Sequence, residues 1–297
     1  MKLRSHNLLT WVPHLFLFYK EKVFRKLFPI MSVVTVYAII IVYADKISGY
    51  VHAIANPNLG QFHLIFSFIL TIIISFRVNT SYSRWWEGRI LWGSIVNNCR
   101  NLGLKFDVYI GLKEHPQFYS LLYKLPFIIK ANLRKDQQKL ESELQALGIS
   151  DGSSQPVILV IKRMYTIINE LRSCDKIRWE QYTAMDLHLA NLMDLAGGCE
   201  RIANTPVPPA FAVFVKQTLL FYSLMFPFGW VDTFGFLIIP VMIMIVYILL
   251  GLEILSEELE DPFGMDDNGL RLGTISKNIA NDIERIAGAA PPQSSEK

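Results

Sequence analysis

The sequence lacks the short motifs that mark common enzyme classes. No HExxH, GxSxG, Walker or GxGxxG pattern stands in a suitable context, and the six histidines are scattered along the chain. Cysteine is also scarce: Cys99, Cys174 and Cys199 are the three present, they form no CxxC spacing, and they lie outside the long apolar runs. The sequence therefore argues against an enzyme and predicts free thiols in a reducing compartment.

Charged residues are few, at 19% of the chain, against 52% hydrophobic residues. This composition is too apolar for an ordinary soluble domain and too charged for a wholly intramembrane one. The formal net charge of +3 is too small to indicate nucleic-acid binding. We therefore expect a membrane-embedded core joined to a soluble part, with a lipid bilayer as the partner of the core.

Four apolar stretches are long enough to cross a bilayer, which takes about 20 residues. We predict transmembrane helices at 27–44, 59–76, 210–228 and 233–252. Lys216 is the only charge in the third stretch, and its long side chain can reach the interface. The second stretch is short, but Arg77, Trp85 and Trp86 follow it, as is typical of a helix leaving the membrane.

The basic residues predict the orientation of these spans. They gather before the first span and after the second, whereas the loop between those two spans offers only Lys46 and the connector at 229–232 has none. Lysine and arginine concentrate in cytoplasmic loops. Both termini, the block 77–204 and the segment 253–286 are therefore predicted to be cytoplasmic.

The large cytosolic block is predicted to be helical. Apolar residues recur every three to four positions over 118–147 and 157–195, which contain no glycine and a single proline, Pro126. A glycine- and serine-rich turn separates the two segments at 148–156. The tail 287–297 is small, polar and proline-containing, and it is predicted to be disordered.

Several separate motifs resemble those of one known family. They are Asn79, Tyr82, Arg84-Trp85-Trp86-Glu87 and Trp92-Gly93 after the second span, the runs 199–202 and 205–208 before the third, Pro227-Phe228-Gly229 with Asp232 after it, and 257–264 after the fourth. The order of these motifs over 27–286 resembles that of the bestrophin family. The resemblance is greater to the bacterial branch than to the animal one. The resemblance implies an all-α membrane protein: a homopentamer with four transmembrane helices per subunit, a pore lined by the second span, and a helical cytosolic vestibule.

The resemblance also implies a hydrophobic pore neck at Phe68, Ile72 and Phe76. These residues are spaced by four, so they share one stripe of a helix, and the last of them lies eight residues before Arg84. Such a stripe taken alone is equally typical of packing against lipid or another helix. In a pore, rings of these side chains gate by steric closure and dewetting.

Acidic residues cluster after the fourth span. Animal bestrophins bind calcium with this segment, and the resemblance implies that Glu258, Asp261 and Asp266 stand at the calcium-binding positions. Carboxylates are suitable ligands for this ion. Where the animal pattern has its last acid, this sequence has Gly269. This departure leaves calcium gating in doubt. The alternative is that the acids form a solvated turn. No cofactor is expected to be required.

Other parts of the pore are less defined by the sequence. A second, cytosolic constriction is implied by the resemblance, with Met185, Leu187 and Leu189 as candidates. Arg84, Trp85, Trp86 and Glu87 are expected to be structural, whereas His63 is either a functional residue within the second span or a residue near its outer mouth.

The expected function is passive conduction of small monovalent ions across a bacterial inner membrane. Acids at the cytosolic side, including Asp175, Glu180 and Asp186, favour sodium-like cations over anions. The alternatives are a chloride channel, as in animal bestrophins, and a non-conducting membrane scaffold. A secondary transporter is disfavoured because no two repeated halves carry matching interrupted spans.

Overall fold

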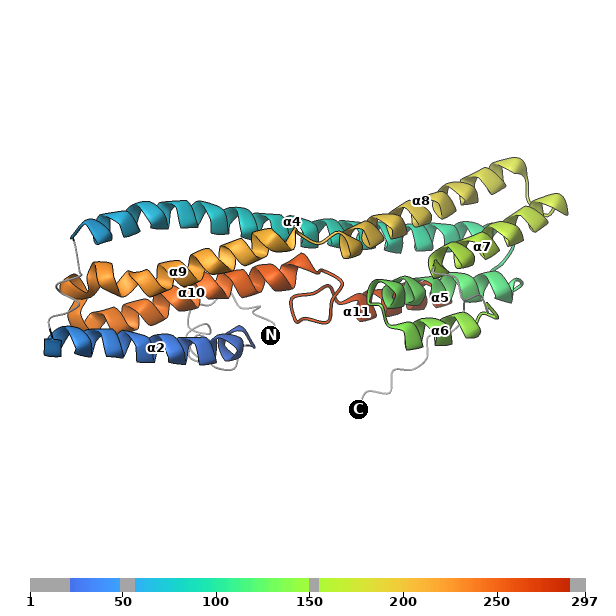
Figure 1. Cartoon of the computed structure of the whole chain (residues 1–297). Coiled ribbons are helices and arrows are strands. Elements are labelled where there is room, and N and C mark those ends of the chain that lie inside the picture. The colour runs from blue at the N-terminus through green and yellow to red at the C-terminus, as the bar shows by residue number, and fades with distance from the viewer. Residues whose placement is uncertain (1–21, 49–56, 150–154, 289–297) are drawn as a thin grey trace, which may run out of the picture. The chain divides into compact units, whose positions relative to one another are not determined.

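The computed structural model describes residues 22–48, 57–149 and 155–288, and every regular element within them is helical. In chain order these elements are α2 (Lys22–Ser48), α4 (Pro57–Tyr109), α5 (Pro116–Leu133), α6 (Gln137–Gln145), α7 (Pro156–Ser173), α8 (Trp179–Asn204), α9 (Pro209–Phe234), the short 3-10 helix η2 (Gly235–Leu237), α10 (Ile238–Glu260) and α11 (Leu272–Ile286) (Figure 1). The predicted all-α fold is confirmed. Most of the predicted disordered tail, from 289 onward, lies outside the described residues.

The chain forms two compact units. The first unit comprises Met1–Tyr82 and Val207–Glu260, and the second comprises Ser83–Pro206 and Asp261–Lys297. Helix α4 contributes its first half to the first unit and its second half to the other.

The first unit is the apolar one. Three segments of the described chain are long and apolar enough to cross a membrane: Val23–Ile47, Asn58–Tyr109 and Pro209–Glu260. The last segment comprises two helices, α9 and α10. The chain reverses between them, and they lie side by side (Figure 1). Helix α2 packs along α10. The number of membrane crossings stays a prediction.

The reversal between α9 and α10 occurs later than the predicted connector at 229–232, which is helical in the structure. The chain turns at Gly235, whose φ of +51° lies in the left-handed region that glycine adopts at little cost. Gly229 has a different role. A Cβ atom there would lie 3.3 Å from the backbone of Leu59 and Gly60, so these glycines let α9 approach α4 closely.

The second unit has its own apolar core. Helices α5, α7, α8 and α11 pack with the second half of α4, and the rings of Phe106 and Phe118 stack with centroids 3.7 Å apart. Each of the two predicted helical segments is divided in two. The breaks lie at Lys135 and Asp175, which have φ values of +53° and +54° although neither is glycine.

Candidate functional site

Phe68, Ile72 and Phe76 project from one open face of α4. Their side chains are 70%, 42% and 66% exposed, whereas Leu70 and Ile74, on the opposite face, are buried in the apolar core of the first unit. This alternation follows from the helical period: residues four apart stay on one face, and those between them turn inward. The structure therefore leaves all three predicted neck residues uncovered by their own unit. The neck itself stays a prediction.

The surface around this stripe is neutral. Thr71, Ser75, Asn79 and Thr80 are the exposed polar neighbours. The Thr71 hydroxyl donates to the Ser67 carbonyl at 2.8 Å, so it is tied to its own helix. The first half of α4 carries no charged side chain before Arg77. An ion passing this face would meet apolar groups and a few hydroxyls and amides, with no charged ligand.

Arg77 turns away from the stripe into the first unit. It is 1% exposed, and its guanidinium donates to Glu260 Oε2 at 2.7 Å and to Glu253 Oε2 at 3.4 Å, both on α10. The other oxygen of Glu260 accepts the Val207 backbone N–H at 2.9 Å. The charge nearest the stripe is thus neutralised inside the unit. From the sequence, Arg77 was predicted only as a membrane-flanking residue, because Glu253 and Glu260 lie 176 and 183 positions away.

The Arg84-Trp85-Trp86-Glu87 motif contacts the C-terminal part of α8 in the second unit. The Arg84 guanidinium donates to the Ile202 and Thr205 carbonyls, each at 2.7 Å, at the C-terminal end of α8. Helix C-termini leave carbonyls without helical partners and carry partial negative charge, so a guanidinium is well suited there. Glu87 pairs with Arg201 of the same helix at 2.6 Å.

The rest of the motif holds the loop after α10. Trp85 donates its indole N–H to the Asn268 carbonyl at 2.9 Å, and a Cβ at Gly88 would lie 3.1 Å from the Phe263 ring. Trp86 stacks on Trp85 with ring centroids 6.4 Å apart and is 50% exposed. The structural role of the motif stays a prediction.

His63 is buried and lies among aromatic rings. Its ring is 4.9 Å from that of Tyr222 and 5.7 Å from that of Phe226, and Nε2 lies 3.3 Å from the Tyr222 carbonyl. The side chain is 3% exposed and does not share the face of the stripe. Its environment is that of a packed core histidine.

The three candidates for the cytosolic constriction differ in how far their side chains are buried. Met185 and Leu189 are fully buried in the core of the second unit, whereas Leu187 is 57% exposed. Residues two apart on a helix face different directions, which the sequence-based set did not take into account. The set is therefore corrected to Leu187, since a core side chain cannot line an open vestibule.

The predicted calcium ligands are divided between the two units. Glu258 lies in the first unit and pairs with Lys26 at 2.7 Å, whereas Asp261 and Asp266 lie in the second. Nowhere in the described residues do three histidine, cysteine or acidic side chains group closely enough to hold a metal ion. At Gly269 a Cβ would lie 3.1 Å from the Asp266 carbonyl oxygen and 3.3 Å from that of Gly264. Calcium binding stays an untested prediction.

A polar cluster between α4 and α8 was not foreseen. His188 Nδ1 lies 2.9 Å from Asn98 Oδ1, and its Nε2 lies 2.8 Å from the Lys105 ammonium. Burial lowers the pKa of His188, and the nearby Lys105 charge lowers it further. Neutral imidazole with its proton on Nδ1 satisfies both contacts. Because its members are spread over 98–188, no local motif could have revealed the cluster.

Curated relatives resemble the chain over most of its length. A voltage-dependent anion channel-forming protein of Nostoc is 33% identical over 248 residues, covering 80% of each chain. A protein with the same description from Mesorhizobium japonicum is 33% identical over 242 residues, covering 80% of this chain and 77% of the relative. The corresponding Escherichia coli protein is 28% identical over 244 residues, covering 79% and 78%.

Solved structures share the fold. A crystal structure of a bacterial bestrophin homologue from Klebsiella pneumoniae superposes with a TM-score of 0.78 at 27% identity, covering 88% of this chain and 98% of that one. The profile of the family described as Bacterial/Fungal Bestrophin protein matches residues 1–285. This all-α membrane protein therefore belongs to the bacterial and fungal bestrophin family.

Proposed function

We propose that this protein is a homopentameric channel that conducts small monovalent ions passively, with Phe68, Ile72 and Phe76 as its neck. The observation that carries the proposal is the open apolar stripe on α4, in a family whose curated relatives are described as channel-forming. A soluble monomer rarely leaves such a stripe uncovered. Packing of copies around one axis would convert each stripe residue into a ring.

The neck would control conduction by its width and by excluding water. An ion passing rings of phenylalanine and isoleucine loses water and gains no ligand in return, so a narrow ring is a barrier. Small changes in the distance between facing side chains then change the barrier steeply. The sequestered charge of Arg77 adds no fixed charge to this surface.

The neutral neck does not itself choose the sign of the ion. The curated relatives are described as anion channel-forming proteins, which favours anions and gives no support to the cation preference expected from the sequence. One observation favours cations as the second candidate: Asp175 and Glu180 are exposed and Asp186 is partly exposed in the second unit. Acids at a pore mouth raise the local cation concentration.

The supporting features complete the proposal. The named relatives are bacterial, so we place the channel in a bacterial plasma membrane. We propose that both termini are cytoplasmic, on the distribution of lysine and arginine. Leu187 is the remaining candidate for a cytosolic constriction. The family and the relatives' descriptions point to a non-enzymatic protein. We further propose that conduction needs no calcium.

Purified protein in a planar bilayer tests the proposal. We expect stepwise single-channel currents, and the reversal potential under a KCl gradient gives the sign of the permeant ion. A folded pentamer that leaves the bilayer silent would instead support a membrane scaffold.

A further inference from the structure

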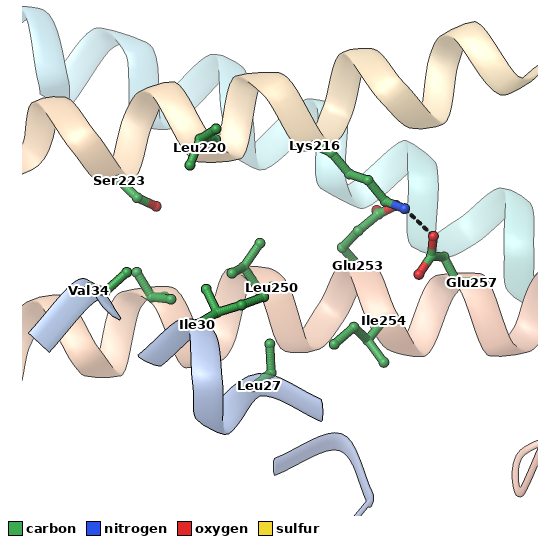
Figure 2. Close-up of a pocket in the computed structure, with 11 residues that line it drawn as sticks. Leu27, Ile30, Val34, Lys216, Leu220, Ser223, Leu250, Glu253, Ile254 and Glu257 are labelled. Carbon is green, nitrogen blue, oxygen red and sulfur yellow. Dashed lines mark hydrogen bonds and ion pairs between the residues drawn. The ribbon is translucent and has the colours of Figure 1, made fainter. Parts of the chain in front are cut away.

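A pocket lies within the first unit between α2, α9 and α10. Its volume is about 450 Å³, within the size range of small-molecule sites. Most of its wall is aliphatic, made of Leu27, Ile30, Val34, Leu220, Leu250 and Ile254 (Figure 2). Leu220 is 61% and Ile30 44% exposed, so the pocket opens at the side of the unit. Its volume and its aliphatic lining suit a hydrocarbon chain.

One end of the pocket is charged. Lys216 on α9 pairs with Glu257 on α10, and the carboxylate of Glu253 points to the same end (Figure 2). Arg77 and Glu260 adjoin Glu253, so this end holds three carboxylates and two cations, which leaves a net negative charge. The Lys216 and Glu257 side chains are 49% and 44% exposed, so a ligand's polar group can reach them.

Glu253 provides a second, independent sign of a ligand. It is 4% exposed, and its Oε2 accepts from Arg77, but its Oε1 is buried with no hydrogen-bond partner among the described residues. A buried carboxylate oxygen without a donor is costly. A ligand that brings N–H donors into this end of the pocket would remove that cost.

We propose that this pocket binds phosphatidylethanolamine, with an acyl chain along the aliphatic wall and the head group at the charged end. The primary ammonium offers three N–H donors, which suits the Glu253 oxygen and Glu257. The phosphate suits Lys216. Phosphatidylcholine has no N–H donor, and phosphatidylglycerol carries a net negative charge, so both match this end less well.

Retention of lipid by the purified protein tests the site. The chain is reconstituted in nanodiscs holding equal amounts of phosphatidylethanolamine, phosphatidylcholine and phosphatidylglycerol, released into detergent, and analysed by native mass spectrometry. We expect wild type to retain phosphatidylethanolamine in preference to the other two lipids. Glu257→Gln should lower that preference about tenfold, since it removes a charge-assisted hydrogen bond.

Two tryptophan variants on α10 form a matched pair. Leu250→Trp fills the pocket and should abolish retention, whereas Ile248→Trp adds the same bulk at an exposed position outside the lining and should not. Size-exclusion chromatography confirms that both assemble. Equal retention of the three lipids by wild type would overturn the proposal. So would equal retention by the two variants, which would place the retained lipid outside this pocket.

The site is independent of conduction. Its test measures bound lipid and no current, so failure of one proposal leaves the other standing. Glu253 is left unchanged in the test because it also holds Arg77.

Discussion

Arg77 on α4 and Glu260 on α10 are joined by an ion pair of 2.7 Å, although 183 positions separate them in the chain. The guanidinium is almost completely buried, and Glu253 approaches it from the same helix as Glu260. This pairing fixes α4, the helix that carries the exposed stripe, to α10 within the first unit.

Loss of Arg77 should destabilise the first unit. Arg77→Met leaves two acids without their cation, and breaking a buried ion pair in this way costs about 3–5 kcal/mol. Thermal unfolding in detergent measures the loss. The triple variant with Glu253→Gln and Glu260→Gln should recover part of it, because no uncompensated charge remains. An Arg77→Met protein as stable as wild type would show that the pair contributes nothing.

Trimming the neck should increase conduction. Ile72→Ala removes apolar bulk from the stripe, so it should raise conductance or open probability without reversing ion selectivity. Phe68→Ala and Phe76→Ala should act in the same direction. Ile40→Ala, at an exposed position of α2, is the matched control and should leave currents unchanged. Single-channel recording decides, and wild-type currents in an assembled Ile72→Ala channel would refute the assignment.

Trp86 should serve assembly. Half of its side chain is exposed in the isolated subunit, so it can contact a neighbouring subunit or the membrane interface. Trp86→Ala should reduce the yield of pentamer more than it changes the current of the channels that form. Trp179→Ala, at an exposed tryptophan of α8, provides a comparison. Normal assembly with altered permeation would contradict this role.

Channel activity should persist when calcium is chelated. Glu258 is already paired with Lys26, and the described residues contain no cluster of three ligands for a metal. Bilayer currents recorded with and without EGTA provide the measurement. A steep loss of current that returns on adding calcium would overturn the expectation.

The second unit should lose stability in mild acid. The pKa of His188 is lowered by burial and by Lys105, so the folded state binds its proton less readily than the unfolded state does. The stabilisation is complete above the unfolded pKa of about 6.5 and decreases as the pH falls below it toward the folded pKa. Thermal unfolding at several pH values measures this. His188→Gln should flatten that part of the profile, and an unchanged profile would exclude His188 as its cause.

The sequence predicted helices well and their interruptions poorly. Apolar runs and three-to-four-residue spacing are local signals, so the membrane core and the helical second unit were foreseen. Lys135 and Asp175 end helices in left-handed conformations that glycine usually marks, and no local rule pointed to them. Gly229 was taken as part of a connector, yet it serves close helix packing, while Gly235 makes the turn.

The sequence predicted the candidate site only where its residues lie on the same helix. Phe68, Ile72 and Phe76 share a face because of their spacing, which the sequence gives directly. The pairing of Arg77 with Glu253, like the contact of His188 with Lys105, joins residues brought together by the fold. For the same reason, the burial of Met185 and Leu189 could not be told from their position on a helical segment.

The crowding around Gly269 bears on how calcium control could arise in evolution. The carbonyl oxygens of Asp266 and Gly264 occupy the space that a side chain would need at this position. An aspartate at this position would therefore require those carbonyl groups to shift by a few tenths of an ångström. A lineage that acquired the acid would acquire this small backbone shift together with it.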